Sequence, residues 1–261
     1  MKDSTITVKT RKGLQNLAVG MFWLIIWQCI HYIVGRDVFV PSPFSVFNVL
    51  LEMIWEEMFW VTVFHSVFRV AVGILLSVIV GAPFGIAAGR IEWIYILFSP
   101  MVSIIKSTPV ISFIIIALVW FKSTNVPIFI GFLMCFPIIW TNTVMGVRQV
   151  DRKLLQMAKI YQISKKDIMK EIYMPSLVPY MSAAIITALG LGWKVGVAAE
   201  VLSHPRRAIG SELHSAKAYV DTPSLFAWTL VVILLSLLFE TVFAKLIRKW
   251  VRSTHFGSHR R

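Results

Sequence analysis

The chain has 261 residues, of which 57% are hydrophobic and only 15% are charged. Soluble domains carry about 25% charged residues, so the composition excludes an ordinary soluble fold. A net charge of +13 would indicate a nucleic-acid partner in a soluble chain, but here the basic residues lie between long apolar runs. We therefore attribute the charge to membrane orientation, and expect one membrane domain with no nucleic-acid partner.

Six apolar stretches are long enough to cross a membrane, since a spanning helix needs roughly 20 mostly apolar residues. Unpaired backbone donors and acceptors are costly in lipid, so each stretch is predicted to be a helix. The predicted fold class is all-α and integral to the membrane, with six transmembrane helices in residues 17–252, a preceding segment 1–16 and a basic tail 253–261. The stretches lie at about 17–35, 61–89, 96–120, 126–146, 178–200 and 225–247.

The basic residues predict which side of the membrane each segment faces. The first stretch is too long for the core of a signal peptide and lacks a cleavage site, so it is expected to remain as a span. Eighteen of the 26 lysines and arginines lie in the termini and in the segments after spans two and four, and five lie in the opposite segments. Because basic residues gather on the cytoplasmic side, we expect both termini and the loop 147–177 to be cytoplasmic.

The outer segment 36–60 has apolar residues near helical spacing after Pro41 and Pro43, with Glu52 and Glu56 among them. This pattern predicts an amphipathic helix that either lies on the outer surface or packs against the bundle.

Small residues recur every four positions in two of the predicted spans. This spacing lets two helix backbones approach closely. Packing within one subunit is its simplest meaning, and a subunit interface or a moving seam is the alternative. The two cysteines, Cys29 and Cys135, lie in apolar stretches and indicate neither a disulfide framework nor a metal site. The small residues are Gly81, Gly85 and Gly89 in the second span, and Ala188, Gly192 and Gly196 in the fifth.

Several ionisable residues fall at membrane depth, among them Glu240, and four of them are candidates for a translocation pathway: Arg69, Lys106, Lys194 and Glu200. Such groups normally face protein or water rather than lipid. The positive ones would offer charge to an anion. The structural alternative is that Lys106 extends its amine to the interface and the others pair internally.

The loop 147–177 is predicted to form two short helices. Leu154, Met157, Ala158 and Tyr161 recur at helical spacing, which gives a first amphipathic helix. Ser164, with an acidic residue three positions later, is predicted to cap a second helix that runs to about residue 173 and ends at Pro175. Two short helices joined at a bend form a protruding surface that a soluble partner can bind.

This loop resembles the cytoplasmic signature of the permease subunits of bacterial ATP-binding cassette (ABC) importers. The signature reads Glu-Ala-Ala, three residues, Gly, nine residues, Ile-x-Leu-Pro. The spacing fits throughout, with Ala158, Ile172 and Pro175 matching and the other four positions departing. The signature positions here are Gln156, Met157, Ala158, Gln162, Ile172, Met174 and Pro175.

Other segments are similar to the same family, and the resemblance covers roughly residues 35–250. They include His65–Val70 with Gly85–Arg90, Phe136–Asp151 and Leu189–Glu200. The likeness favours the nitrate, sulfonate and taurine branch, which implies a small organic anion such as a sulfonate, or a vitamin precursor, as the substrate. It also implies a bacterial inner-membrane location and a second permease subunit, most simply in a homodimer. The remaining implied partners are a pair of ABC ATPase subunits, an extracytoplasmic substrate-binding protein and membrane lipid.

The chain has no Gly-x-x-x-x-Gly-Lys-Ser/Thr phosphate loop. We therefore expect it to be no enzyme and to hold no cofactor, with ATP bound by the partner ATPase. The resemblance assigns seven residues to the ATPase-coupling loop: Gln156, Met157, Ala158, Tyr161, Gln162, Ile172 and Pro175. The alternatives are a secondary transporter or channel, which would need intramembrane acids near broken helices, and a membrane enzyme, for which no catalytic motif is present.

Overall fold

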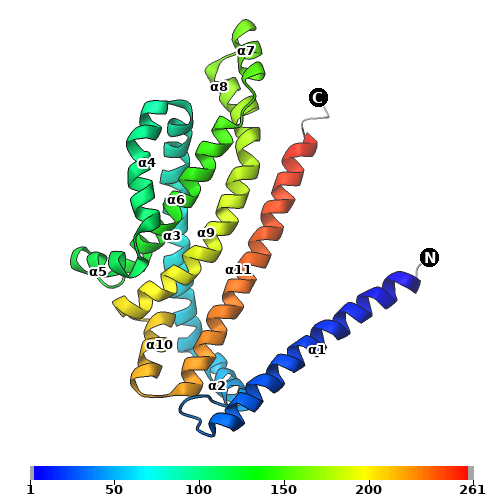
Figure 1. Ribbon diagram of the computed structural model, residues 1–261, viewed down its shortest axis with the longest axis vertical. Coiled ribbons are helices and arrows are strands. Elements are labelled where there is room, and N and C mark those ends of the chain that lie inside the picture. Colours follow the sequence, from blue (N-terminus) through cyan, green and yellow to red (C-terminus); the bar gives the residue numbers. More distant parts are fainter. Residues whose placement is uncertain (1–2, 258–261) are drawn as a thin grey trace. The chain divides into compact units, whose positions relative to one another are not determined.

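The computed structural model describes residues 3–257, with the side chains of residues 15, 17–243 and 245 (Figure 1). Every regular element in this range is a helix, as predicted. Residues 3–16 belong to α1 and residues 253–257 to α11, so the described parts of the predicted terminal segments continue spanning helices. Residues 1–2 and 258–261 of those segments lie outside the described range. The helices are α1 Asp3–Val34, α2 Pro43–Trp55, α3 Glu57–Arg90, α4 Glu92–Ser107, α5 Val110–Trp120, α6 Val126–Arg148, α7 Arg152–Ile160, α8 Lys165–Asp167, the π-helix η1 Ile168–Tyr173, α9 Met174–Ser203, α10 Ile209–Ala218 and α11 Thr222–Gly257.

Five stretches of described helix are long and apolar enough to cross a membrane, and the bent pair α4 and α5 is a sixth candidate. The span predicted at about 96–120 is present as this bent pair, in which α4 and α5 meet at 104°. Pro109 restricts the residue before it to extended backbone, and Thr108 indeed has φ −82° and ψ 134°. The helix therefore has to break there.

The chain divides into two compact units, Met1–Trp60 with Glu212–Val231 and Val61–Ser211 with Val232–Arg261. In the first unit, α2 begins where its sequence predicts. The Ser42 hydroxyl accepts a hydrogen bond from the Ser45 N–H at 3.1 Å, and Pro43 occupies the first turn, where no N–H is needed.

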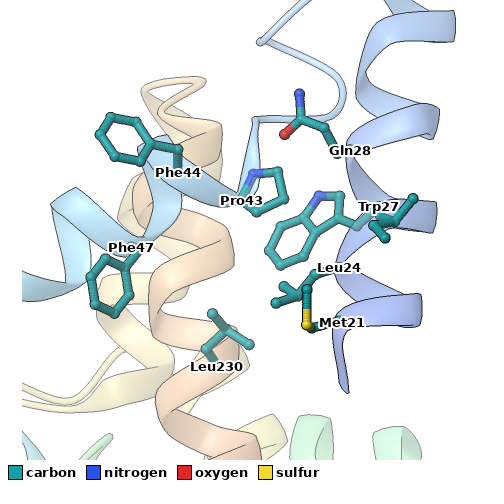
Figure 2. Close-up of a pocket in the computed structure, with 9 residues that line it drawn as sticks. Met21, Leu24, Trp27, Gln28, Pro43, Phe44, Phe47 and Leu230 are labelled. Atoms are coloured by element: carbon teal, nitrogen blue, oxygen red, sulfur yellow. The ribbon is translucent and has the colours of Figure 1, made fainter. Parts of the chain in front are cut away.

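Aromatic contacts organise the rest of this unit. The Trp27 indole N–H donates to the Pro41 carbonyl at 3.1 Å, and its ring stacks on Phe226 at 5.9 Å. Phe59 stacks on Trp228 at 5.2 Å. An apolar pocket of about 510 Å³ lies among α1, α2 and the start of α11 (Figure 2), lined by Met21, Leu24, Ile25, Trp27, Gln28, Pro43, Phe44, Phe47 and Leu230.

In the second unit, α6 packs along α9, and the small-residue face of α3 lies against α6. A Cβ atom on Gly85 would come within 2.6 Å of the Thr143 side chain, and one on Gly196 would come within 2.5 Å of Val70. Any larger residue would force the backbones apart. Close packing within one subunit, predicted from the four-residue spacing, is confirmed.

The candidate coupling surface and the intramembrane charges

The segment between α6 and α9 forms a knob, which we define as residues 151–173. Figure 1 shows α7 and α8 projecting beyond the ends of α6 and α9. The Asp151 carboxylate accepts a hydrogen bond from the Lys153 N–H at 2.8 Å and so caps α7. The Ser164 hydroxyl accepts from the Asp167 N–H at 3.2 Å and donates to the Asp167 carboxylate at 2.6 Å. The predicted second cap is confirmed.

The second helix of the knob does not stop at residue 173, and that prediction is wrong. The turn widens into η1, where the Met174 N–H donates to the Met169 carbonyl, and continues directly into α9. Pro175 then lies in the first turn of α9. A proline lacks the N–H that an uninterrupted α-helix would use and clashes with the carbonyl four residues before it, and the wider π turn accommodates both defects.

The inner face of the knob is a small hydrophobic core. Val147, Val150, Tyr173 and Leu177 are buried in it, with residues of η1 packed around them. Ala158 is only 1% exposed. The resemblance assigns Ala158 to the ATPase-coupling loop, but the structure buries its side chain within the chain itself. Its size serves the packing of α7.

The outer face of the knob carries the large apolar side chains that α7 does not bury. Ile160 is 78% exposed and Tyr161 is 74% exposed. Gln156 and Gln162 lie exposed on the same segment, while Ile172 is half-buried. The other exposed apolar residues of the knob are Leu154, Met157 and Ile163.

The end of α7 is a Schellman motif. The Ile163 N–H donates to the Ala158 carbonyl at 2.9 Å, and the Gln162 N–H donates to the Lys159 carbonyl at 3.2 Å. The residue between the last helical turn and Ile163 must adopt a left-handed conformation, and Gln162 has φ +52°. This is the position at which the signature has glycine, the residue that adopts positive φ without strain.

Two arginines at the base of the knob stack on aromatic rings. The Arg148 guanidinium pairs with the Glu92 carboxylate at 2.7 Å and lies 4.0 Å from the centre of the Tyr95 ring. These contacts tie the start of α4 to the end of α6. Arg90, the last residue of α3, lies 5.3 Å from the centre of the Tyr173 ring of η1.

Arg69 and Glu200 form an ion pair at 2.9 Å with side chains 4% and 0% exposed. The same guanidinium donates to the Arg206 and Arg207 carbonyls at 2.8 and 3.2 Å. These two charges therefore bind each other and the segment after α9. Of the four candidate pathway residues, only Lys106 and Lys194 keep their charges exposed.

Two members of this network were missed by the sequence predictions. The Ser66 hydroxyl donates to the Glu200 carboxylate at 2.8 Å and accepts from the Ile209 N–H at 2.9 Å. The Gly210 N–H donates to the same carboxylate at 3.2 Å. Ser66 lies three residues before Arg69, on the same helix face. A buried carboxylate needs several hydrogen-bond donors. The three-residue spacing of Ser66 and Arg69 could therefore have indicated that both side chains donate to the same buried acid.

Lys106 and Lys194 lie at separate places in the second unit. Lys106 is in the last turn of α4, beside the bend, and donates to the Thr141 hydroxyl at 2.8 Å. Lys194 lines a cavity of about 700 Å³ between α9 and α11, together with Glu240 and Lys245. Among the residues whose side chains are described, no group of three metal-binding side chains is close enough to hold a metal ion.

One carboxyl group of the first unit has a perturbed pKa. Partial burial of Glu212, and secondly the nearby charge of Glu56, raise the pKa of the Glu212 carboxyl above its ordinary value. Both effects disfavour the ionised form.

Comparison with known proteins identifies relatives of this chain among permease proteins. The chain is 31% identical over 191 residues to the nitrate import permease protein NrtB of Synechococcus elongatus, covering 69% of this chain and 68% of that protein. It is 28% identical over 202 residues to the bicarbonate transport system permease protein CmpB of the same organism, covering 72% of each.

A solved structure supports the fold. A chain of the MetNI methionine ABC transporter, in an inward-facing conformation, superposes with a TM-score of 0.63 at 13% identity, covering 74% of this chain and 98% of that one. The predicted permease fold is thereby confirmed. The family model described as "binding-protein-dependent transport system inner membrane component" matches residues 81–252. The chain belongs to this family and is a multi-pass membrane permease subunit of an ABC importer.

Proposed function

We propose that this permease carries a small oxyanion across the bacterial inner membrane and is driven through residues 151–173 by a separate ATPase. The observation that carries the proposal is the set of large apolar side chains exposed on the knob. A soluble loop rarely exposes several such groups together unless they bind a partner. The family implies both an ATPase and a substrate-binding protein as partners.

The coupling step follows from the way the knob is anchored. Its inner face packs on the ends of α6 and α9, so a force on α7 acts on both helices. We infer that ATP binding to the partner brings two ATPase subunits together, draws the knobs of two permease copies with them and favours one orientation of the pathway. Hydrolysis then restores the other orientation. A ligand shifts such an equilibrium only through its unequal affinity for the two states.

The assembly that we propose is a homodimer of this chain with two ATPase subunits on the knob side. The excess of basic residues in the termini and in loop 147–177 supports a cytoplasmic location for that side. The substrate-binding protein then docks at the opposite, outer side. ATP is held by the ATPase alone, and this chain supplies the pathway.

The substrate class rests on Lys106 and Lys194 and on two relatives. Exposed lysines at membrane depth attract anions, and the relatives named for nitrate and bicarbonate point to small, flat oxyanions. A sulfonate presents the same kind of oxygen face and is included in the proposal. A vitamin precursor without an anionic group would instead leave the two lysines without a role in substrate recognition.

The coupling proposal is tested by placing a charge on the outer face of the knob. Ile160→Asp introduces a carboxylate where the ATPase would exclude water, and an unpaired charge taken out of water is costly. We expect the tagged permease to retain about a tenth or less of the ATPase subunit that the wild type retains. Gln156→Glu, which introduces the acidic residue of the signature, should keep ATPase binding intact.

The matched control is Tyr219→Asp, because Tyr219 is equally exposed but lies beyond the knob, after α10. It should retain the ATPase and keep the membrane domain monodisperse. Full ATPase binding and full transport by Ile160→Asp would show that the knob is not the coupling element.

A further inference from the structure

Two adjoining cavities form a groove between α3 and the segment η1–α9. Their volumes are about 610 and 270 Å³, and Ile86 and Met174 line both. Met169 and Met181 also line the groove, so three flexible methionines face it. Such side chains adapt to apolar ligands of variable shape.

The hydroxyl groups in the groove are already satisfied by their own helices. The Thr143 hydroxyl donates to the Ile139 carbonyl at 2.7 Å, and the Ser182 hydroxyl donates to the Val178 carbonyl at 2.6 Å. Seven of the nine residues that line the smaller cavity are apolar, and helix carbonyls already engage both hydroxyl hydrogens there. Its interior therefore suits a hydrocarbon.

The mouth of the groove is different, because it carries a positive charge. Pro83, Ile86, Ala87 and Arg90 line the α3 wall at helical spacing, so the wall ends in the arginine. Arg90 is exposed, and among the described side chains no carboxylate pairs with it within 4 Å. Its guanidinium lies over the Tyr173 ring. The guanidinium thus remains able to bind an anion.

We propose that this groove binds an anionic phospholipid, with the phosphate at Arg90 and one acyl chain along Ile86 and Met174. The helix end that carries Arg90 belongs to the strongly basic side, which we assign to the cytoplasm. A basic pocket between membrane helices on that side is suited to an acidic lipid headgroup. One wall of the groove is η1, so the lipid touches the joint between the knob and α9.

The test uses the full chain, purified in detergent, stripped of lipid and then titrated with phosphatidylglycerol or phosphatidylcholine. Native mass spectrometry counts the bound lipids. We expect phosphatidylglycerol to bind in preference to phosphatidylcholine. Arg90→Gln should weaken phosphatidylglycerol binding about fivefold, since one basic residue near a membrane surface contributes about 1 kcal/mol. Arg90→Lys should keep most of the affinity.

Two further variants separate the groove from general surface charge. Arg152→Gln removes an exposed arginine of the same side but outside the groove, and should leave binding unchanged. Met174→Trp fills the groove and should reduce binding of both lipids without removing a charge. Equal phosphatidylglycerol binding by the wild type and Arg90→Gln would overturn the proposal. So would a disulfide between two copies that carry Met174→Cys, because a second copy would then occupy the groove.

Discussion

Replacing Gln162 by glycine should stabilise the knob. Gln162 has φ +52°, and a left-handed conformation costs an L-residue about 1–2 kcal/mol. Glycine avoids this cost, but ordering its backbone costs roughly 0.5–1 kcal/mol more than for other residues. Near the middle of both ranges, the difference leaves a net gain of about 0.5–1 kcal/mol.

This gain is local, so it is best measured by amide hydrogen exchange. The informative amide is that of Ile163, whose hydrogen bond to the Ala158 carbonyl closes the motif. If this amide exchanges by local opening, a gain of 0.5–1 kcal/mol slows its exchange about two- to fivefold. Amides in the middle of α6 should exchange as in the wild type.

The matched control is Gln149→Gly. Gln149 also follows the last turn of a helix, but its φ is −81°. Glycine relieves no strain there and should leave exchange unchanged or make it faster. Unchanged exchange at Ile163 in Gln162→Gly would refute the reasoning, because it would mean that the left-handed position carries no strain.

Three further results are expected. Breaking the buried pair with Arg69→Met should lower the free energy of unfolding by roughly 3–5 kcal/mol, and adding Glu200→Gln should recover part of it; failure of the double variant to improve on the single one would argue against an uncompensated buried charge. The raised pKa of the Glu212 carboxyl means that the folded state binds its proton more tightly. This stabilisation should be complete below the ordinary glutamate pKa of about 4.3, and it should be lost as pH rises through the raised pKa of the folded state. Glu212→Gln should therefore flatten the dependence of the melting temperature on pH in this range. In intact cells, a Lys166→Cys variant should resist an impermeant thiol reagent while Ser215→Cys reacts, and the reverse pattern would invert the proposed topology.

The spans and caps could be predicted from the sequence because they depend on local patterns. Apolar length predicted where most spans lie, and the spacing of small residues predicted the close packing of α3, which rests on residues such as Gly85. The cap at Ser164 follows a three-residue rule that needs no tertiary information. These features are set by neighbours in the chain.

The errors have the opposite origin. The direction that Ala158 faces depends on the packing of α7 against η1, and spacing alone does not show which side of an amphipathic helix is the inner one. Pro175 was expected to end a helix, but the wider turn of η1 accommodates it. The pairing of Arg69 with Glu200 joins residues 131 positions apart. Nothing local in the sequence specifies that contact.

The bend between α4 and α5 has an electrostatic consequence for Lys106. The C-terminal end of a helix presents free carbonyl groups and a macrodipole equivalent to about half a negative charge. Lys106 lies in the last turn of α4, so its ammonium group sits beside this negative end and is partly neutralised by it. The attraction that Lys106 exerts on an anion is therefore smaller than that of a full charge. Removing the lysine would do more than abolish that attraction, because the bare helix end would then repel the same anion.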